Sequence, residues 1–100
     1  MSMYNILYVS VDCPRCGAHV TVESEFRIGY LDLFEYQIGD VVKWFENGSD
    51  SARRPPGGNI DGEAYAQCPK CDKDFWLTVF VRNDRFEGAE VDATRKGYVP

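Results

Sequence analysis

Residues 12–28 read DCPRCGAHVTVESEFRI, and this stretch contains the two patterns on which the predicted fold depends. Cys13 and Cys16 stand two residues apart around a proline, and Gly17 follows them. The proline fixes φ for a tight turn, and glycine accepts the left-handed conformation that this last position needs. Residues 19–28 then alternate between polar and apolar, which is typical of a β-strand with one buried and one wet face.

The same turn occurs a second time. Residues 68–72 read CPKCD, and Asp72 takes the position after the second cysteine. Aspartate tolerates the left-handed conformation better than most residues. Each turn points two sulfurs at one cation, so two turns that face each other complete a tetrahedral site of four thiolates. The pattern predicts one structural zinc ion (Zn2+) with four ligands, namely Cys13, Cys16, Cys68 and Cys71.

Three other uses of paired cysteines compete with zinc. A disulfide is disfavoured, because the spacing and the turn residues are those of a metal site and the chain shows no export signal. A thioredoxin-like redox pair requires a helix that begins at a cysteine within a βαβ unit, and neither flank has a helical pattern. Four thiolates also suit iron, which is the alternative metal and would imply electron transfer.

The paired turns, each between two strands, resemble the zinc-ribbon family. In zinc ribbons the four cysteines bind structural zinc, so the resemblance implies the same role for the four cysteines here. The 51 residues between the two pairs exceed the short connection of a minimal ribbon. We therefore expect a zinc-ribbon-like antiparallel sheet with a β-meander inserted between the turns. The size, the acidity and the cysteine pairs also resemble small bacterial immunity proteins with two such pairs.

The rest of the chain adds strands to an all-β domain. Residues 4–11 and 75–82 are rich in aromatic and β-branched residues, which predicts well-covered strands, and residues 63–67 predict a short one. Between residues 31 and 45 the spacing also fits one short helix, but the aromatic residues and paired valines favour strands. Residues 48–62 hold four glycines and two prolines, so we expect a flexible loop, or a functional one.

Length and charge limit the classes of function. One hundred residues suit a single domain spanning residues 1–100. No apolar run approaches the roughly 20 residues that span a bilayer and no signal peptide is evident, so we expect a cytoplasmic chain without a membrane partner. The net charge of −5 lies in residues 17–50, where seven acids meet two bases. This balance disfavours nucleic acid and favours a basic protein partner, unless the acidic surface serves only solubility.

The sequence does not predict an enzyme. A metal with four thiolates has no open position, His19 is the only histidine, and no nucleophile or phosphate-binding motif occurs, so we expect no small-molecule substrate. The leading hypothesis is a non-catalytic domain that binds a protein partner, in its most concrete form an immunity-type inhibitor of a toxin. The residues expected at the interface are acidic or aromatic: Glu23, Glu25, Asp32, Glu35, Tyr36 and Trp44.

The alternative hypothesis is a nucleic-acid-binding zinc ribbon. In that case basic side chains would contact phosphates and an exposed aromatic ring would stack on a base. The residues available for this role are Arg15, Arg53, Arg54, Lys70, Lys73, Trp76 and Phe80.

Overall fold

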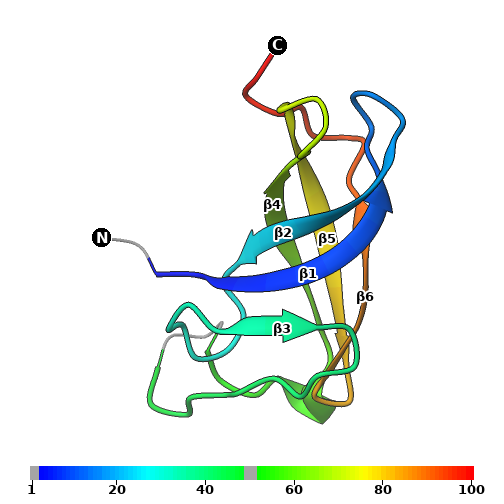
Figure 1. Cartoon of the computed structure of the whole chain (residues 1–100). Coiled ribbons are helices and arrows are strands. Elements are labelled where there is room, and N and C mark those ends of the chain that lie inside the picture. Colours follow the sequence, from blue (N-terminus) through cyan, green and yellow to red (C-terminus); the bar gives the residue numbers. More distant parts are fainter. Residues whose placement is uncertain (1–2, 49–51) are drawn as a thin grey trace.

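The computed structural model describes residues 3–48 and 52–100, and these residues form one curled β-sheet (Figure 1). Its strand order is β3-β1-β2-β4-β5-β6. The strands are β1 (Asn5–Asp12), β2 (His19–Phe26), β3 (Glu35–Gln37), β4 (Ile60–Gln67), β5 (Asp74–Arg82) and β6 (Arg85–Val91). Within the described residues, the only helical element is the 3₁₀ turn η1 (Pro56–Gly58). The all-β prediction is confirmed.

Two hairpins make up most of the sheet, and each contains one cysteine turn. β1 and β2 pair along their whole length, and β4 and β5 do the same. The two hairpins are joined through β2 and β4, which pair only at Glu25 with Tyr65 and at Phe26 with Ala64. Figure 1 shows the β1–β2 hairpin crossing over the β4–β5–β6 unit. The cysteine turns are thus brought together from the ends of two separate hairpins.

One strand pair is parallel, so the sheet is mixed rather than wholly antiparallel. After β2 the chain crosses the start of β1, and β3 then runs parallel to β1, with Ile6 opposite Glu35 and Tyr8 opposite Gln37. The insert between the cysteine turns is therefore not a meander, in which each strand would pair with the next along the chain. β2, the first strand of the insert, pairs with one side of β1. β3 pairs with the other side of β1 and forms the edge of the sheet.

A buried asparagine holds the loop that makes this crossing. Asn5 is 0% exposed, and its Nδ2 donates to the carbonyl oxygens of Ile28 at 3.3 Å and Tyr30 at 2.8 Å. Its Oδ1 accepts from the backbone N–H groups of Asp32 at 3.2 Å and Phe34 at 3.1 Å. All four bonds go to backbone groups that would otherwise lack partners, which is how a loop can pack against the core.

Alternating side chains of every long strand form the core. The alternation predicted for residues 19–28 is confirmed, since Val20, Val22, Phe26 and Ile28 are at most 5% exposed. Their partners are the inward residues of the neighbouring strands: Leu7, Val9, Val11, Ala64, Ala66, Phe75, Leu77, Val79, Val81 and Phe86. Aromatic rings fill the middle of this core, with ring centroids 5.2 Å apart for Phe26 and Phe86 and 4.7 Å apart for Tyr36 and Phe86.

The segment predicted as strands or a helix over residues 31–45 contains only the three-residue β3 and loop. After β3 the backbone contacts the start of β6: the Gly39 N–H donates to the Phe86 carbonyl at 2.8 Å, and the Phe86 N–H donates to the Asp40 carbonyl at 3.1 Å. These bonds bring the two edges of the curled sheet together. β6 itself was not predicted; a two-residue turn at Asn83 and Asp84, both with positive φ, joins it to β5.

Part of the loop predicted over residues 48–62 is regular structure. Residues 49–51 lie outside the described residues, η1 occupies Pro56–Gly58, and β4 begins at Ile60. Asp84 anchors the loop, because its carboxylate accepts two hydrogen bonds from the Arg54 guanidinium, at 2.7 and 3.0 Å. Among the described residues, no helix has the length and apolar character needed to cross a membrane.

Candidate metal centre

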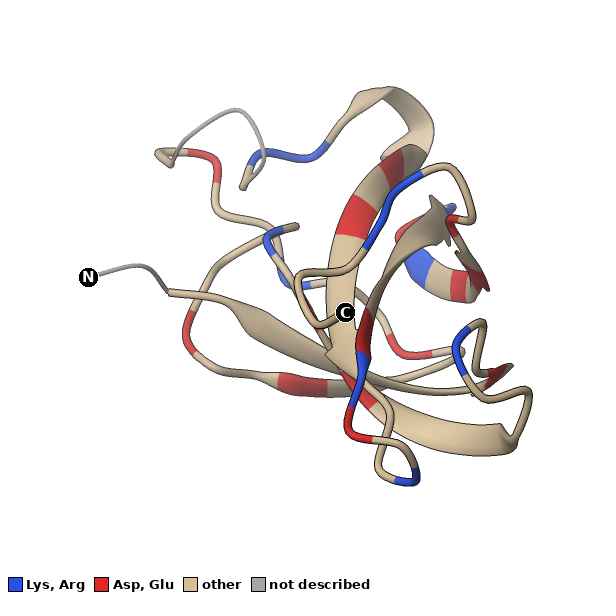
Figure 2. Ribbon diagram, turned by 90° about the horizontal axis from the view of Figure 1, so that it is seen from above, with Lys and Arg blue, Asp and Glu red and all other residues tan. Residues whose placement is uncertain are grey.

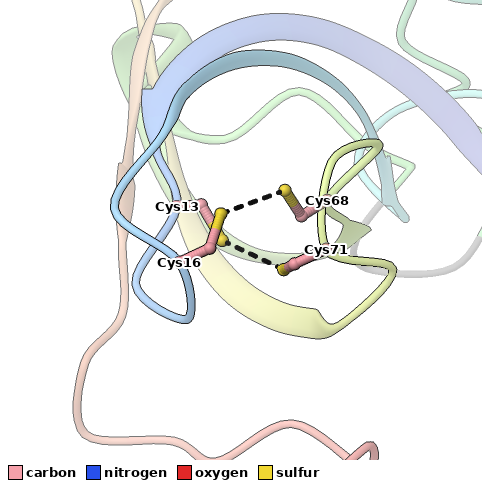
Figure 3. Close-up of side chains that lie close together, drawn as sticks. All are labelled: Cys13, Cys16, Cys68 and Cys71. Carbon is pink, nitrogen blue, oxygen red and sulfur yellow. Dashed lines mark hydrogen bonds between the residues drawn. The ribbon is translucent and has the colours of Figure 1, made fainter.

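The four predicted ligands lie together in one cluster (Figure 3). The sulfur atoms of Cys13, Cys16, Cys68 and Cys71 all lie within 4.8 Å of one another. Sγ of Cys13 is 3.8 Å from that of Cys71, and Sγ of Cys16 is 3.9 Å from that of Cys68. Sulfurs bound to one metal at 2.3 Å with tetrahedral geometry are about 3.8 Å apart, so the cluster fits a single metal ion. A disulfide requires about 2.05 Å, and all four cysteines are free.

The backbone of both turns is built as the sequence predicts. In the first turn, the Gly17 N–H donates to the Cys13 carbonyl at 2.8 Å, and in the second, the Asp72 N–H donates to the Cys68 carbonyl at 3.0 Å. Gly17 has φ +79° and Asp72 has φ +60°, so both take the left-handed conformation. This reversal of the chain places the two cysteines of each turn side by side, because their backbones curl around a common centre.

Backbone N–H groups of the turns lie close to the cysteine sulfurs and affect the pKa of the thiols. The N–H of Arg15 points at Sγ of Cys13 at 3.3 Å, and the N–H of Lys70 points at Sγ of Cys68 at 3.4 Å. Burial raises the pKa of Cys13, but hydrogen bonds from the backbone of Cys16 and Arg15 outweigh it and lower that pKa to about 7. Such N–H groups favour the thiolate, which is the form that binds metals.

Without a cation between them, the neighbouring thiols disfavour one another's ionisation. The N–H of Lys73 lowers the pKa of Cys71, but burial and hydrogen bonds to the other thiols raise it to about 11. Four sulfurs this close cannot all be negative unless a cation lies between them, since like charges at short range disfavour ionisation. The donor set therefore suits a metal ion, and four protein ligands leave it no open position for a substrate.

A second cluster ties the first cysteine turn to the C-terminal residues. Asp74 is 1% exposed and accepts hydrogen bonds from the Tyr65 hydroxyl and from the N–H groups of Tyr98 at 2.7 Å and Val99 at 2.9 Å. The Arg15 guanidinium lies 3.6 Å from the Asp74 carboxylate and donates a hydrogen bond to the backbone carbonyl of Asp74 at 2.9 Å. The carboxylate thus connects β5, β4, the first cysteine turn and residues 98–99.

Three of the predicted interface residues gather on the exposed side of β3, β1 and β2. Glu23 and Glu25 lie on β2, Glu35 lies on β3, and Tyr8 of β1 stands between them. The Tyr8 hydroxyl donates to Glu35 and lies 3.3 Å from Glu23 Oε1. The hydrogen bond to Glu35, partial burial and the charges of Glu35 and Glu23 together raise the pKa of Tyr8 to about 12. We call these four residues the acidic face; Tyr8 was not predicted as part of it.

The other three predicted interface residues are placed differently. Tyr36 is 3% exposed and packs on Phe86 in the core, so the prediction that it lies on the surface is wrong. Its alternation within β3 turns it inward, whereas its neighbour Glu35 points out. Trp44 is half-buried, and its indole Nε1 donates to Asp84 at 2.9 Å. Asp32 is exposed, but it lies in the crossing loop and not on the acidic face.

More than half of the acidic residues of the chain lie in the strands. The six strands contain nine acidic residues and only two basic ones, Arg82 and Arg85. Most Lys and Arg residues instead lie in turns, loops and the C-terminal segment, as Figure 2 shows. Some of the basic groups available for nucleic acid already have partners in the fold: Arg15 contacts Asp74, and Arg54 contacts Asp84.

Comparisons with known proteins find no matching protein family, no similar curated protein and no similar solved structure. The resemblance to zinc ribbons therefore rests on the two cysteine turns and their sulfur geometry. The metal-binding cluster is the part of the site that the structure supports directly.

Proposed function

We propose that this chain is a non-catalytic β domain, held together by one zinc ion, that binds a basic protein partner through its acidic face. The cysteine cluster supports the first half of the proposal, because four thiolates at tetrahedral spacing suit zinc and give it a closed coordination shell. The metal then has a structural role. It fastens the turn of the β1–β2 hairpin to the turn of the β4–β5 hairpin; apart from core packing, these hairpins share only two backbone ladder pairs.

The observation that carries the second half is the set of uncompensated carboxylates on the acidic face. Within the described residues, no Lys or Arg forms an ion pair with Glu23, Glu25 or Glu35. The pKa of Tyr8 is raised by its hydrogen bond to Glu35 and by burial, and the charges of Glu35 and Glu23 raise it further. Like charges held this close on a rigid sheet favour binding of a positive surface, and they accelerate its association.

The most concrete form of the proposal is an immunity-type inhibitor. In this form the partner is a toxin with a basic active site, and the acidic face covers that site. A three-stranded face with a central tyrosine suits such an occluding contact, because tyrosine is favoured at the centre of interfaces.

The proposal is tested by charge reversal on the acidic face against a matched control. Glu23→Lys with Glu35→Lys raises the net charge from −5 to −1, and Glu87→Lys with Glu90→Lys on β6 makes the same change elsewhere. Each tagged variant is used for affinity purification followed by mass spectrometry. The proposal predicts a basic protein that is recovered with the wild type and the control but lost with the acidic-face variant.

Two outcomes would contradict it. One is a partner whose recovery survives reversal of Glu23 and Glu35. The other is a gel shift with short RNA or DNA at low salt, together with no protein partner, which would favour the nucleic-acid alternative.

A further inference from the structure

A groove of about 610 Å³ lies on the outer side of the sheet, where β2 meets β4 and β5. We call it the aromatic groove, because three of its lining residues are in ring contact with one another. The centroids of Tyr65 and Trp76 are 5.0 Å apart, those of Tyr65 and Tyr98 are 5.8 Å apart, and those of Trp76 and Tyr98 are 6.1 Å apart. Carboxylates also line it, from Glu25, Asp61 and Glu63.

The chain places one of its own cations against this groove. The guanidinium carbon of Arg95 lies 3.7 Å from the centroid of the Trp76 ring, and Arg95 also forms an ion pair with Glu63. An aromatic face together with a carboxylate is the arrangement that recognises a guanidinium group, and Trp provides the strongest aromatic partner. The pair Trp76 and Glu63 is therefore a complete guanidinium site, with Arg95 as its internal occupant.

We infer that the aromatic groove is a binding site for an arginine side chain of the basic partner, and that Arg95 competes for it from within the chain. This inference rests on the proposed function, because it assigns the groove to the same partner. Charge supports it at two carboxylates: Glu25 forms no ion pair with a Lys or Arg among the described residues, and Glu63 pairs only with the exchangeable Arg95. The third, Asp61, already pairs with Arg82, and Arg27 is the one base that lines the groove. Glu25 borders both the groove and the acidic face, so one partner surface can contact both at once.

Arg95 can leave the groove while the rest of the fold stays in place. Its side chain is 39% exposed and that of Glu63 is 70% exposed, so water reaches both groups of the ion pair. The anchors of the C-terminal residues lie further along, at Tyr98 and Val99, whose N–H groups bind the buried Asp74. A partner arginine that replaces Arg95 would form the same contact with the Trp76 ring and the same ion pair with Glu63, so the exchange conserves the interactions of the site.

The test measures binding of a defined probe, a blocked peptide of alternating arginine and serine, by isothermal titration calorimetry. Arg95→Ala removes the competitor and should tighten binding about two- to fivefold. The matched control Lys96→Ala removes the same charge from the next exposed residue and should leave the affinity unchanged. With Arg95→Ala as the background, so that no internal competitor changes at the same time, Glu63→Gln, which preserves side-chain size, and Trp76→Phe, which keeps a smaller aromatic ring, should each weaken binding at least about threefold.

The inference is overturned if Arg95→Ala binds no tighter than wild type, or if a peptide with citrulline in place of arginine binds equally well. It is also overturned if Glu23→Lys with Glu35→Lys abolishes peptide binding while Glu63→Gln has no effect. That last result would leave the acidic face as the binding surface, so it would separate failure of this inference from failure of the proposed function.

Discussion

Replacement of Asn5 by leucine should detach the loop that leads into β3. Asn5→Leu keeps a buried side chain of similar size but removes all four hydrogen bonds to the backbone of the crossing loop. One bond is fully buried, and a buried backbone group without a partner costs about 1–3 kcal/mol. The other three are partly buried, where water replaces part of the loss, so each contributes about 0.5–1 kcal/mol.

The expected loss is about 3–5 kcal/mol of unfolding free energy, a large part of the 5–15 kcal/mol typical of a domain. Denaturation with urea measures it, and at this chain length the midpoint temperature should fall by at least about 12 °C. The matched control is Ser24→Ala. Ser24 is also 0% exposed and lies in the same hairpin, but it donates only one bond, to the Leu7 carbonyl at 2.7 Å, so it should cost about 1 kcal/mol.

A local measurement links this loss to the acidic face. Hydrogen exchange at the amides of Asp32 and Phe34 should accelerate in Asn5→Leu, because both N–H groups lose their acceptor. The pKa of Tyr8 should fall from about 12 towards 10, since β3 no longer holds Glu35 beside it. If Asn5→Leu costs no more than Ser24→Ala, or if the two amides exchange as in the wild type, the buried amide does not hold the loop.

Further predictions concern the cysteine turns and the Asp74 cluster. Gly17 and Asp72 both have positive φ, so Asp72→Gly should raise the unfolding free energy by about 0.5–1 kcal/mol and Gly17→Ala should lower it by about 1 kcal/mol. Thermal melting measures both changes, and opposite signs would contradict the prediction. Gly97→Ala should cost about 1–3 kcal/mol in urea denaturation, because its Cβ would lie 2.3 Å from Asp74 Oδ1; an unchanged midpoint would refute the close contact. Although burial raises it, hydrogen bonds from Tyr65 and the backbone of residues 98–99 lower the pKa of Asp74 to about 2. A lowered pKa stabilises the fold above the ordinary value of 3.8, and this contribution is lost as pH falls to about 2. The unfolding free energy of the wild type should therefore exceed that of Asp74→Asn above pH 4, and the two should converge near pH 2. A difference in unfolding free energy that stays constant with pH would contradict this.

Local patterns allowed much of the fold to be predicted. Alternation over residues 19–28 identified β2 and its buried face, because a half-buried strand imposes a period of two on its own residues. The cysteine turns could be predicted for the same reason: spacing, proline and the residue with positive φ all lie within five positions. Two such local motifs were enough to indicate the metal cluster, although 51 residues separate them.

The features that the sequence did not reveal depend on contacts between distant residues. The parallel pairing of β3 depends on bonds from Asn5 to residues 23 to 29 positions away, and an asparagine within an apolar run carries no sign of such partners. β6 has only a weak apolar pattern and is stabilised by pairing with β5. Asn83 and Asp84 were the available signal for it, since residues that tolerate positive φ favour a two-residue hairpin turn.

The functional surfaces were only partly predictable for a related reason. Acidic residues were correctly placed on the outer side of β2, but Tyr36 proved to be in the core because the short β3 turns it inward. The aromatic groove is built from Tyr65 and Trp76, which face each other across β4 and β5, and from Tyr98 in the C-terminal segment. Strand register brings these rings together, and register depends on the whole sheet.

The central claim is that one metal ion joins the two cysteine turns, and metal analysis of the purified chain before and after chelation tests it most directly. The account predicts one zinc per chain, no bound metal in Cys13→Ser, and a large drop in the melting temperature when a chelator removes the ion, because the ion fastens the two cysteine turns and the hairpins otherwise share only core packing and two backbone ladder pairs. A purified chain without metal, or a chelated chain that melts at the same temperature as the metal-bound one, would contradict it.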